Sequence, residues 1–171
     1  MQKGPEYFVE AANLVTKRIP NVRFLMAGAG DLTRKMIEKM ASLKLADKFH
    51  FTGFLSPEDR EKVFAMSDIY VMPSVSEPFG ITPLEAMKYN IPIIISKQSG
   101  IAEVLDHVIK VDFWDIEKLA SAIINILEDE TLSQKVGQQN KFALERVGWD
   151  FAAKSCLKVY QDTLVEMSFN T

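Results

Sequence analysis

Short apolar runs alternate with helix-like patterns along the first two thirds of the chain. Apolar residues recur at helical spacing over 5–19 and again over 32–43. Between and after them lie runs of β-branched and other apolar residues, which we interpret as buried strands at 22–27, 48–52, 69–72, 91–95 and 108–111. The run at 22–27 is expected to be buried on both faces after Arg23. Strands that alternate with helices predict the α/β class, here as a Rossmann-like, doubly wound parallel sheet.

Helix signals mark the rest of the chain. Ser56-Pro57-Glu58-Asp59 joins an N-cap residue, a proline and two acids, a combination that predicts a helix start. After Asp112 the pattern is helical, with predicted helices over 116–127, 131–145 and 149–167. The last of these has one apolar face, made by Ala153, Leu157, Tyr160 and Leu164. We therefore expect extra C-terminal helices beside the sheet.

The stretch from Ser74 to Ala86 is the strongest candidate for a ligand site. It follows the predicted strand at 69–72 and leads through a glycine and two prolines into a predicted helix. In such sheets ligands bind at the carboxyl ends of the strands, and unpaired N–H groups at a helix start suit an anion. Glu77 precedes this turn and Glu85 lies in the helix, with seven residues between them. Two carboxylates around an anion site predict a ligand with both phosphate and hydroxyl groups, such as a nucleotide-sugar.

Composition narrows the function classes. The chain has 171 residues, a length typical of one domain, and a net charge of −3, so electrostatics give no case for a nucleic-acid partner. Cys156 stands alone, which is compatible with a reducing compartment, and we expect a cytoplasmic location. No apolar run approaches the ~20 residues that span a bilayer. His50 and His107 are far apart and are better explained as structural residues, so neither a metal site nor a cofactor is predicted.

The segment Glu77-Pro-Phe-Gly-Ile-Thr-Pro-Leu-Glu85 resembles the Glu-x7-Glu motif of retaining glycosyltransferases with the two-Rossmann-domain (GT-B) fold. More narrowly, it is similar to family 4, or group 1, which includes glycogen and sucrose synthases. Four flanking segments also resemble that family, namely Lys3-Gly4, Ala27-Gly-Ala-Gly-Asp31, Phe51-Thr-Gly-Phe-Leu55 and Ser99-Gly-Ile-Ala-Glu103. The last has Ser99 in place of the first glycine of the family's Gly-Gly-x-x-Glu segment.

The resemblance implies that residues 1–171 form the C-terminal, donor-binding domain of such an enzyme. The family's preceding strand, and the arginine five residues before its lysine, would lie ahead of Met1, and the N-terminal acceptor domain would be absent. The implied activity moves a hexose from a UDP-, GDP- or ADP-sugar to a saccharide, lipid or other acceptor. We expect this part alone to be inactive, and membrane contact to occur only through the missing domain.

The resemblance also assigns residue roles. Glu85 would accept hydrogen bonds from the ribose hydroxyls, although a solvated acid near a helix N-terminus is the ordinary alternative. Glu77 would act at the transferred hexose, as the catalytic carboxylate that stabilises an oxocarbenium-like transition state. A nucleophilic role for Glu77 stays open, as does that of an ordinary loop acid. Lys3 would place its charge on the diphosphate, or behave as a frayed terminal lysine with nothing upstream to anchor it.

The other assignments concern backbone groups and aromatic neighbours. The N–H groups of Phe79, Gly80, Ile81 and Thr82 would contact the diphosphate and the sugar. Gly30 and Phe54 would lie near the nucleotide, and Phe54 is equally compatible with a place in the core.

Two other classes of function compete with transfer. One is a nucleotide-sugar-binding module without catalytic activity. The other is a GT-B enzyme of another reaction class, such as a sugar-nucleotide epimerase or a phosphorylase. A dinucleotide-dependent oxidoreductase is a distant alternative, because Gly28-Ala-Gly30 lacks the third glycine of that fingerprint.

Overall fold

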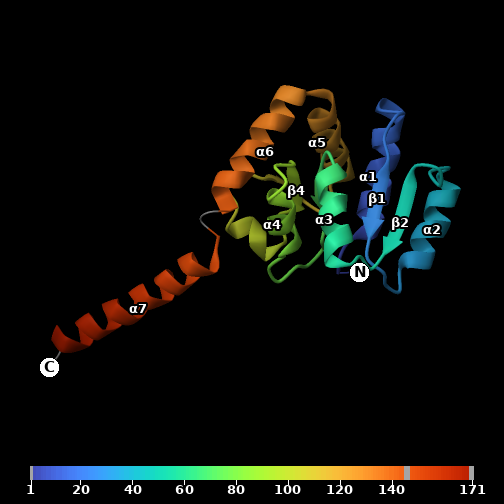
Figure 1. The fold of residues 1–171 in the computed structure, drawn as a ribbon. Helices are drawn as coiled ribbons and strands as arrows, with labels where there is room; N and C mark the ends of the chain where they lie inside the picture. Colours follow the sequence, from blue (N-terminus) through green and yellow to red (C-terminus); the bar gives the residue numbers. More distant parts are fainter. Residues whose placement is uncertain (1, 145–146, 170–171) are drawn as a thin grey trace.

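The computed structural model describes residues 2–144 and 147–169, and within them helices alternate with short strands (Figure 1). In chain order the elements are α1 (Pro5–Arg18), β1 (Phe24–Ala27), α2 (Thr33–Ser42), β2 (Phe49–Gly53), α3 (Pro57–Met66), β3 (Tyr70–Met72), α4 (Thr82–Met87), β4 (Ile93–Ser96), the 3-10 helix η1 (Gly100–Glu103), β5 (Ile109–Val111), α5 (Ile116–Glu128), α6 (Glu130–Leu144) and α7 (Trp149–Phe169). Every strand predicted from the sequence is present within two residues of its expected bounds.

All strand pairs of the described residues are parallel, as predicted for the α/β class. They form two hydrogen-bonded sheets, one of β1 and β2 and one in the order β3-β4-β5. Phe24 is aligned with Phe49 in the first sheet, and Ile94 with Ile109 in the second. The sequence predicted a single sheet. In the described residues this sheet is split into two, because β1 and β3 are not hydrogen-bonded to each other.

The core follows the apolar runs. Ile93, Ile94 and Ile95 of β4 are fully buried, because helices cover both faces of this central strand. Ile94 packs with α1 and α5, whereas Ile93 and Ile95 pack with α4. The expectation that the first strand is buried on both faces is confirmed only at Phe24, since Leu25 and Met26 are partly exposed and Ala27 is exposed.

Capping signals in the sequence form as predicted. Ser56 Oγ accepts a hydrogen bond from the backbone N–H of Asp59 at 3.1 Å and begins α3.

A buried side chain joins α6 to the central sheet region: Asn140 of α6 donates its side-chain amide to the carbonyl of Ile91 at 2.8 Å. This contact ties α6 to the loop that enters β4.

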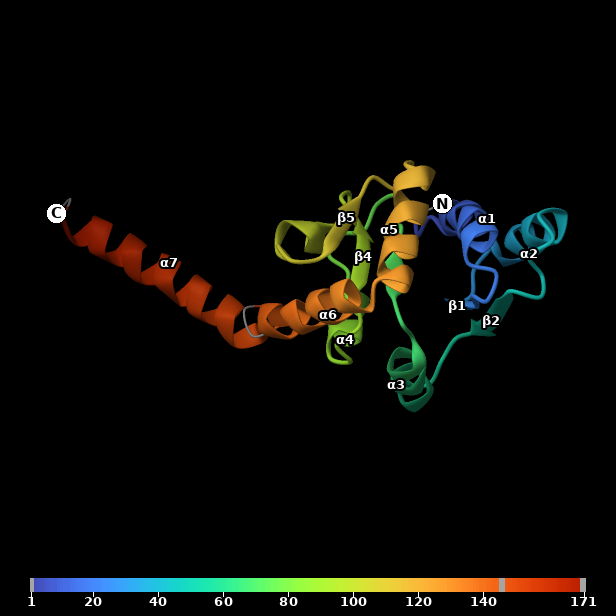
Figure 2. The same cartoon turned by 90° about the horizontal axis from the view of Figure 1, so that it is seen from above.

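Helix α7 extends away from the rest of the domain (Figures 1 and 2). Its side chains at 151–164 are exposed, including the predicted apolar face of Ala153, Leu157, Tyr160 and Leu164. Within the described part of the chain, α7 included, no helix is both long enough and apolar enough to cross a membrane.

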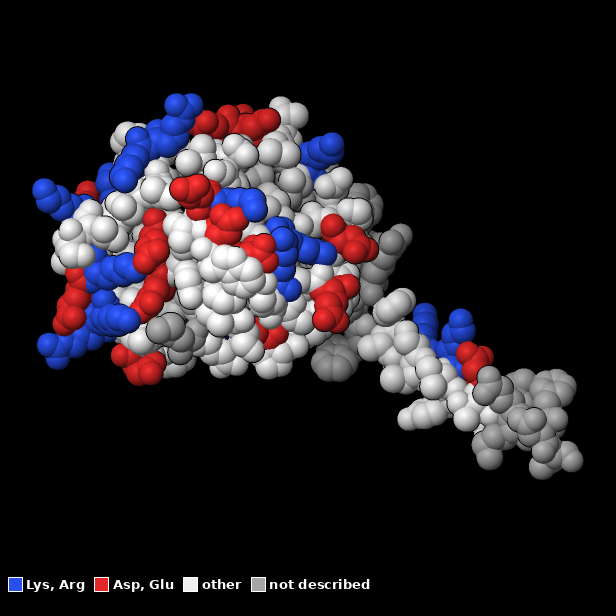
Figure 3. Space-filling view, turned by 180° about the vertical axis from the view of Figure 1, so that it is seen from behind, with Lys and Arg blue, Asp and Glu red and all other residues white. Residues whose placement is uncertain are grey.

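Basic and acidic side chains are interspersed on the face seen in Figure 3. Ion pairs join neighbouring helices, such as Lys35 with Glu6 between α2 and α1, and Arg18 with Glu128 between α1 and α5 at 2.7 Å.

Candidate functional site

The loop between β3 and α4 carries Glu77 and is held by the loop that follows β4. The backbone N–H of Gly100 donates to the carbonyl of Glu77, and the N–H of Ile101 donates to that of Phe79, each at 2.8 Å. Glu77 and Ser99 also form an isolated parallel bridge. These contacts bring the Glu-x7-Glu segment and the Ser-Gly-x-x-Glu segment together at the carboxyl ends of their strands.

The two loops approach more closely than a side chain would allow. A Cβ atom on Gly100 would lie 2.1 Å from the carbonyl oxygen of Pro78, so glycine is required at this position. Beneath this contact, buried Ser96 donates its hydroxyl to the carbonyl of Ser74 at 2.5 Å. The backbone of the Glu77 loop is therefore held both by Ser96 of β4 and by the loop that follows β4.

The N-terminal segment is fixed against the same loop. The carbonyl of Gln2 accepts hydrogen bonds from the N–H groups of Val75, at 2.9 Å, and Ser76, at 3.3 Å. Gly4 has a φ of 62°, and a Cβ there would lie 2.1 Å from the carbonyl oxygen of Pro73. The reading of Lys3 as a frayed terminal lysine is therefore wrong, because the residues on both sides of it are tied to the loop.

Lys3 and Glu77 are in direct contact. The Lys3 ammonium forms an ion pair with Glu77 Oε2, and the Glu77 side chain is only 11% exposed. Gly80, with a φ of 102°, lies alongside, and a Cβ there would come within 3.3 Å of Glu77 Cγ. The structure thus joins the two residues to which the family resemblance assigns the diphosphate and the reacting sugar.

Glu85 lies in the first turn of α4 and is paired with a residue from another helix. Its Oε1 lies 3.1 Å from Nη2 of Arg60 in α3. Its Oε2 is shielded from solvent and has no hydrogen-bond partner among the described residues. The Glu85 side chain is one-quarter exposed, so the carboxylate is only partly covered.

A tyrosine lies near both acids. The hydroxyl of Tyr70 in β3 donates to Thr82 Oγ1 at 2.8 Å and so links β3 to the start of α4. Burial raises the pKa of Tyr70 to about 12, and the negative charges of Glu77 and Glu85 act in the same direction. Tyr70 therefore keeps its proton at neutral pH and stays a hydrogen-bond donor.

The remaining predicted residues lie elsewhere or at the surface. Phe79 and Ile81 are 41% and 65% exposed beside the acids, whereas Phe54 is 85% exposed and is not a core residue. Gly30 has open space around its Cα and an ordinary φ, so its backbone does not require glycine. Among the described residues, no hydrogen bond or ion pair joins Gly30 or Phe54 to Glu77 or Glu85.

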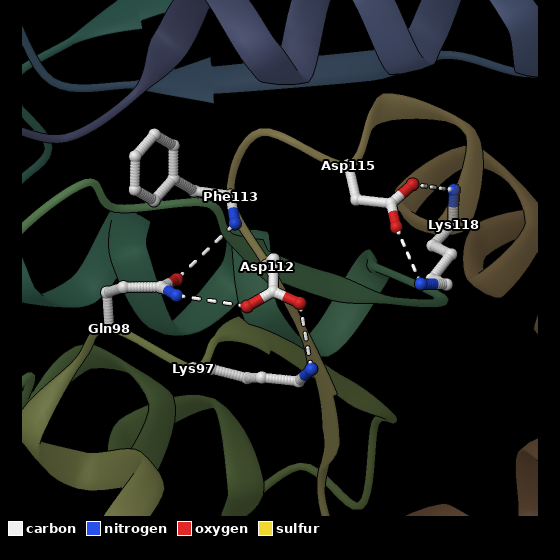
Figure 4. A network of polar contacts seen from close by, with 6 residues as sticks. All are labelled: Lys97, Gln98, Asp112, Phe113, Asp115 and Lys118. Carbon is white, nitrogen blue, oxygen red and sulfur yellow. Dashed lines mark hydrogen bonds and ion pairs between the residues drawn. The ribbon is translucent and has the colours of Figure 1, made fainter.

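A polar network connects the loops after β4 and β5 (Figure 4). Asp112 accepts from Lys97 at 2.8 Å and from the Gln98 amide at 3.0 Å, and these two bonds hold its pKa below the ordinary value. The Gln98 carbonyl oxygen in turn accepts from the N–H of Phe113. The network fixes the strand-end segment that leads directly into Ser99 and Gly100.

Sequence reasoning missed three residues of this site. Gln2 acts through its backbone carbonyl, which no side-chain pattern can identify. Tyr70 lies in an apolar run that reads as an ordinary strand, and Arg60 lies in a polar helix where an arginine is unremarkable. Their contacts depend on how α3, β3 and the N-terminal segment meet, which the linear sequence does not state.

Comparison with known proteins finds related sequences and folds. The model of the family described as "Glycosyl transferases group 1" matches residues 1–142. An uncharacterized glycosyltransferase of Methanocaldococcus jannaschii is 31% identical over 165 residues, which make up 94% of this chain and 42% of that protein. The chain thus spans less than half the length of this relative.

Two solved structures share the fold. HepE of Anabaena, in complex with UDP and glucose, superposes with a TM-score of 0.81 at 20% identity over 94% of this chain and 45% of its own. The C-terminal domain of LpcC, a glycosyl transferase group 1 family protein of Francisella tularensis, superposes with a TM-score of 0.76 at 22% identity. That match covers 85% of this chain and 80% of the LpcC domain.

Proposed function

Because the chain belongs to the glycosyl transferases group 1 family, we propose that it is the donor-binding part of a retaining hexosyltransferase with the GT-B fold. The observation that carries the proposal is the contact of Lys3 with Glu77 beside Gly80. A cation suited to a diphosphate and a largely shielded acid suited to a sugar lie side by side at the carboxyl ends of the strands.

The proposed chemistry follows from these two side chains. Lys3 binds the diphosphate and stabilises the negative charge that develops on it as the bond to the anomeric carbon breaks. Glu77 holds the hexose and stabilises the oxocarbenium-like charge on that carbon. The acceptor oxygen attacks from the face that the diphosphate leaves, and its proton passes to a departing phosphate oxygen. The products are the glycoside, with its configuration retained, and the nucleoside diphosphate.

The other predicted residues complete the donor site in this proposal. Glu85 accepts hydrogen bonds from the ribose hydroxyls, and the backbone of Phe79, Gly80, Ile81 and Thr82 contacts the diphosphate and the sugar. Gly30 and Phe54 lie on the nucleotide side. The chemistry uses no cofactor and no metal, since Lys3 neutralises the leaving group.

The proposal also covers the acceptor and the cellular location of the enzyme. A saccharide or lipid-linked acceptor binds to an N-terminal domain outside these residues, and the enzyme works in the cytoplasm. The match of the chain to the isolated LpcC domain supports such a division. The UDP and glucose bound to HepE support a nucleoside-diphosphate hexose as the donor.

Calorimetric titration with UDP, GDP and ADP tests the donor site. We expect one of them to bind, and Lys3→Met to weaken its affinity about tenfold or more, because charge-assisted hydrogen bonds to phosphate are strong. Lys35→Met is the matched control, since Lys35 also pairs with a glutamate but lies on the α1–α2 face. Equal affinity of the wild type and Lys3→Met for all three nucleotides would contradict the proposal.

Transfer is tested in the longer protein with its acceptor. Glu77→Gln should keep nucleoside-diphosphate affinity within about threefold and reduce transfer by about a hundredfold or more, as for other groups that stabilise transition-state charge. Unchanged transfer would instead favour a binding role for this domain without a catalytic acid at Glu77.

A further inference from the structure

The ion pair between α3 and α4 has no place in the function described so far. Arg60 reaches Glu85 from a helix that follows the loop of Phe54, and 43% of its side chain is exposed. Surface ion pairs contribute little to stability as a rule. This pair is different in position, because its acid is the one proposed to bind the ribose.

The packing of α3 explains why Arg60 points toward Glu85. Arg60 and Phe64 are four residues apart and so lie on one face of the helix. Phe64 is buried and packs its ring against Tyr70 at 5.9 Å and Tyr89 at 5.8 Å, which are the centroid distances. These contacts turn the Arg60 face of α3 toward α4.

The surroundings of the two Glu85 carboxylate oxygens indicate the role of Arg60. Oε2 is covered by protein, so a ligand hydroxyl meets the carboxylate on the side of Oε1, where Arg60 stands. A glutamate side chain has considerable rotamer freedom to lose on binding a ligand. A guanidinium at 3.1 Å reduces that freedom before a ligand arrives and leaves the carboxylate oriented to accept hydrogen bonds.

We propose that Arg60 is a positioning residue for the ribose: it orients Glu85 so that Oε1 can accept hydrogen bonds from the ribose hydroxyls. This inference rests on the proposed role of Glu85 in donor binding. It makes the selection of ribose over deoxyribose depend on a residue of α3 as well as on the Glu-x7-Glu segment.

The test compares UDP, GDP and ADP with their 2′-deoxy forms, using calorimetry on the 171-residue chain. We expect the wild type to prefer the ribonucleotide by about tenfold, the value of one strong hydrogen bond. Arg60→Met, which keeps the apolar stem, should reduce this preference to about threefold or less. Arg60→Lys should restore part of it, because the positive charge remains while the planar fork is lost.

Two comparisons separate positioning from a general effect on structure. Arg34→Met removes an exposed arginine that pairs with Glu38 at 3.0 Å within α2, and should leave the preference unchanged. In a chain that carries Glu85→Gln, the preference should be lost already, and adding Arg60→Met should change it no further. A melting curve for each variant confirms that the chain is folded, and Arg60→Lys serves if Arg60→Met does not fold.

The outcomes are distinguishable. If Arg60→Met weakens the ribo- and deoxyribonucleotide by the same factor, Arg60 does not act through the ribose and the inference is overturned while the proposed function stands. If Glu85→Gln also leaves the preference of the wild type intact, the ribose role of Glu85 fails together with that of Arg60. If none of the three nucleotides binds the wild type, the proposed function fails, and this inference with it.

Discussion

Gly100→Ala is the substitution whose effect on the site follows most directly from the structure. The new Cβ would lie 2.1 Å from the carbonyl oxygen of Pro78 and 3.3 Å from Cα of Phe79, both of them backbone atoms. Ordinary contact begins at 3.4 Å, so the loop must retreat by about 1.3 Å, and no flexible side chain can absorb the movement. The retreat displaces the backbone that carries Glu77.

The cost comes from the hydrogen bonds between the two loops. The bonds from Gly100 to Glu77 and from Ile101 to Phe79 are both 2.8 Å long and cannot both survive such a shift. At about 1 kcal/mol each, their loss lowers the free energy of unfolding by about 2 kcal/mol. For a chain of this size that corresponds to a fall of about 4–8 °C in the melting temperature.

Thermal unfolding measures this directly, with Gly148→Ala as the matched control. Gly148 has an ordinary φ, and a Cβ there would meet no atom within 4 Å, so its replacement should move the melting temperature by less than about 2 °C. Nucleoside-diphosphate affinity should fall in Gly100→Ala and not in the control. If both variants have the melting temperature of the wild type, the two loops accommodate the added methyl group without losing their hydrogen bonds, and the prediction is wrong.

Three further substitutions test other parts of the domain. Asn140→Ala should cost about 1–3 kcal/mol of unfolding free energy in urea denaturation, because it leaves a buried backbone carbonyl unpaired, whereas exposed Asn125→Ala should cost far less. Tyr70→Phe removes the hydrogen bond to Thr82 and should cost about 0.5–1.5 kcal/mol in the same assay; no loss would show that this bond is not formed in solution. Asp112→Asn should lower the melting temperature at pH 7. Since the pKa of Asp112 is held below its ordinary 3.8, its stabilisation is present above pH 3.8, and the difference from wild type should shrink as pH falls below that value.

Local patterns were sufficient for most elements of the fold. The apolar run at 91–95 predicted a buried strand, and the structure confirms it over Ile93–Ser96, because a continuous apolar run cannot present a polar face to water. Ser56 predicted the start of α3, since its hydroxyl satisfies an N–H group within its own turn. Ala27 was assigned wrongly to the interior, because the position of a strand within a sheet depends on neighbours that are distant in sequence.

The sequence by itself determined the class of the fold, the order of its elements and the two acids that flank a glycine turn, because each of these is a property of contiguous residues. The tertiary structure alone decided that Lys3 meets Glu77 and that Arg60 meets Glu85. Both contacts join residues from separate elements, and their geometry depends on hydrogen bonds and packing between backbone segments rather than on residue type. For that reason the candidate site could be predicted from the chain, while the residues that form ion pairs with its carboxylates could not.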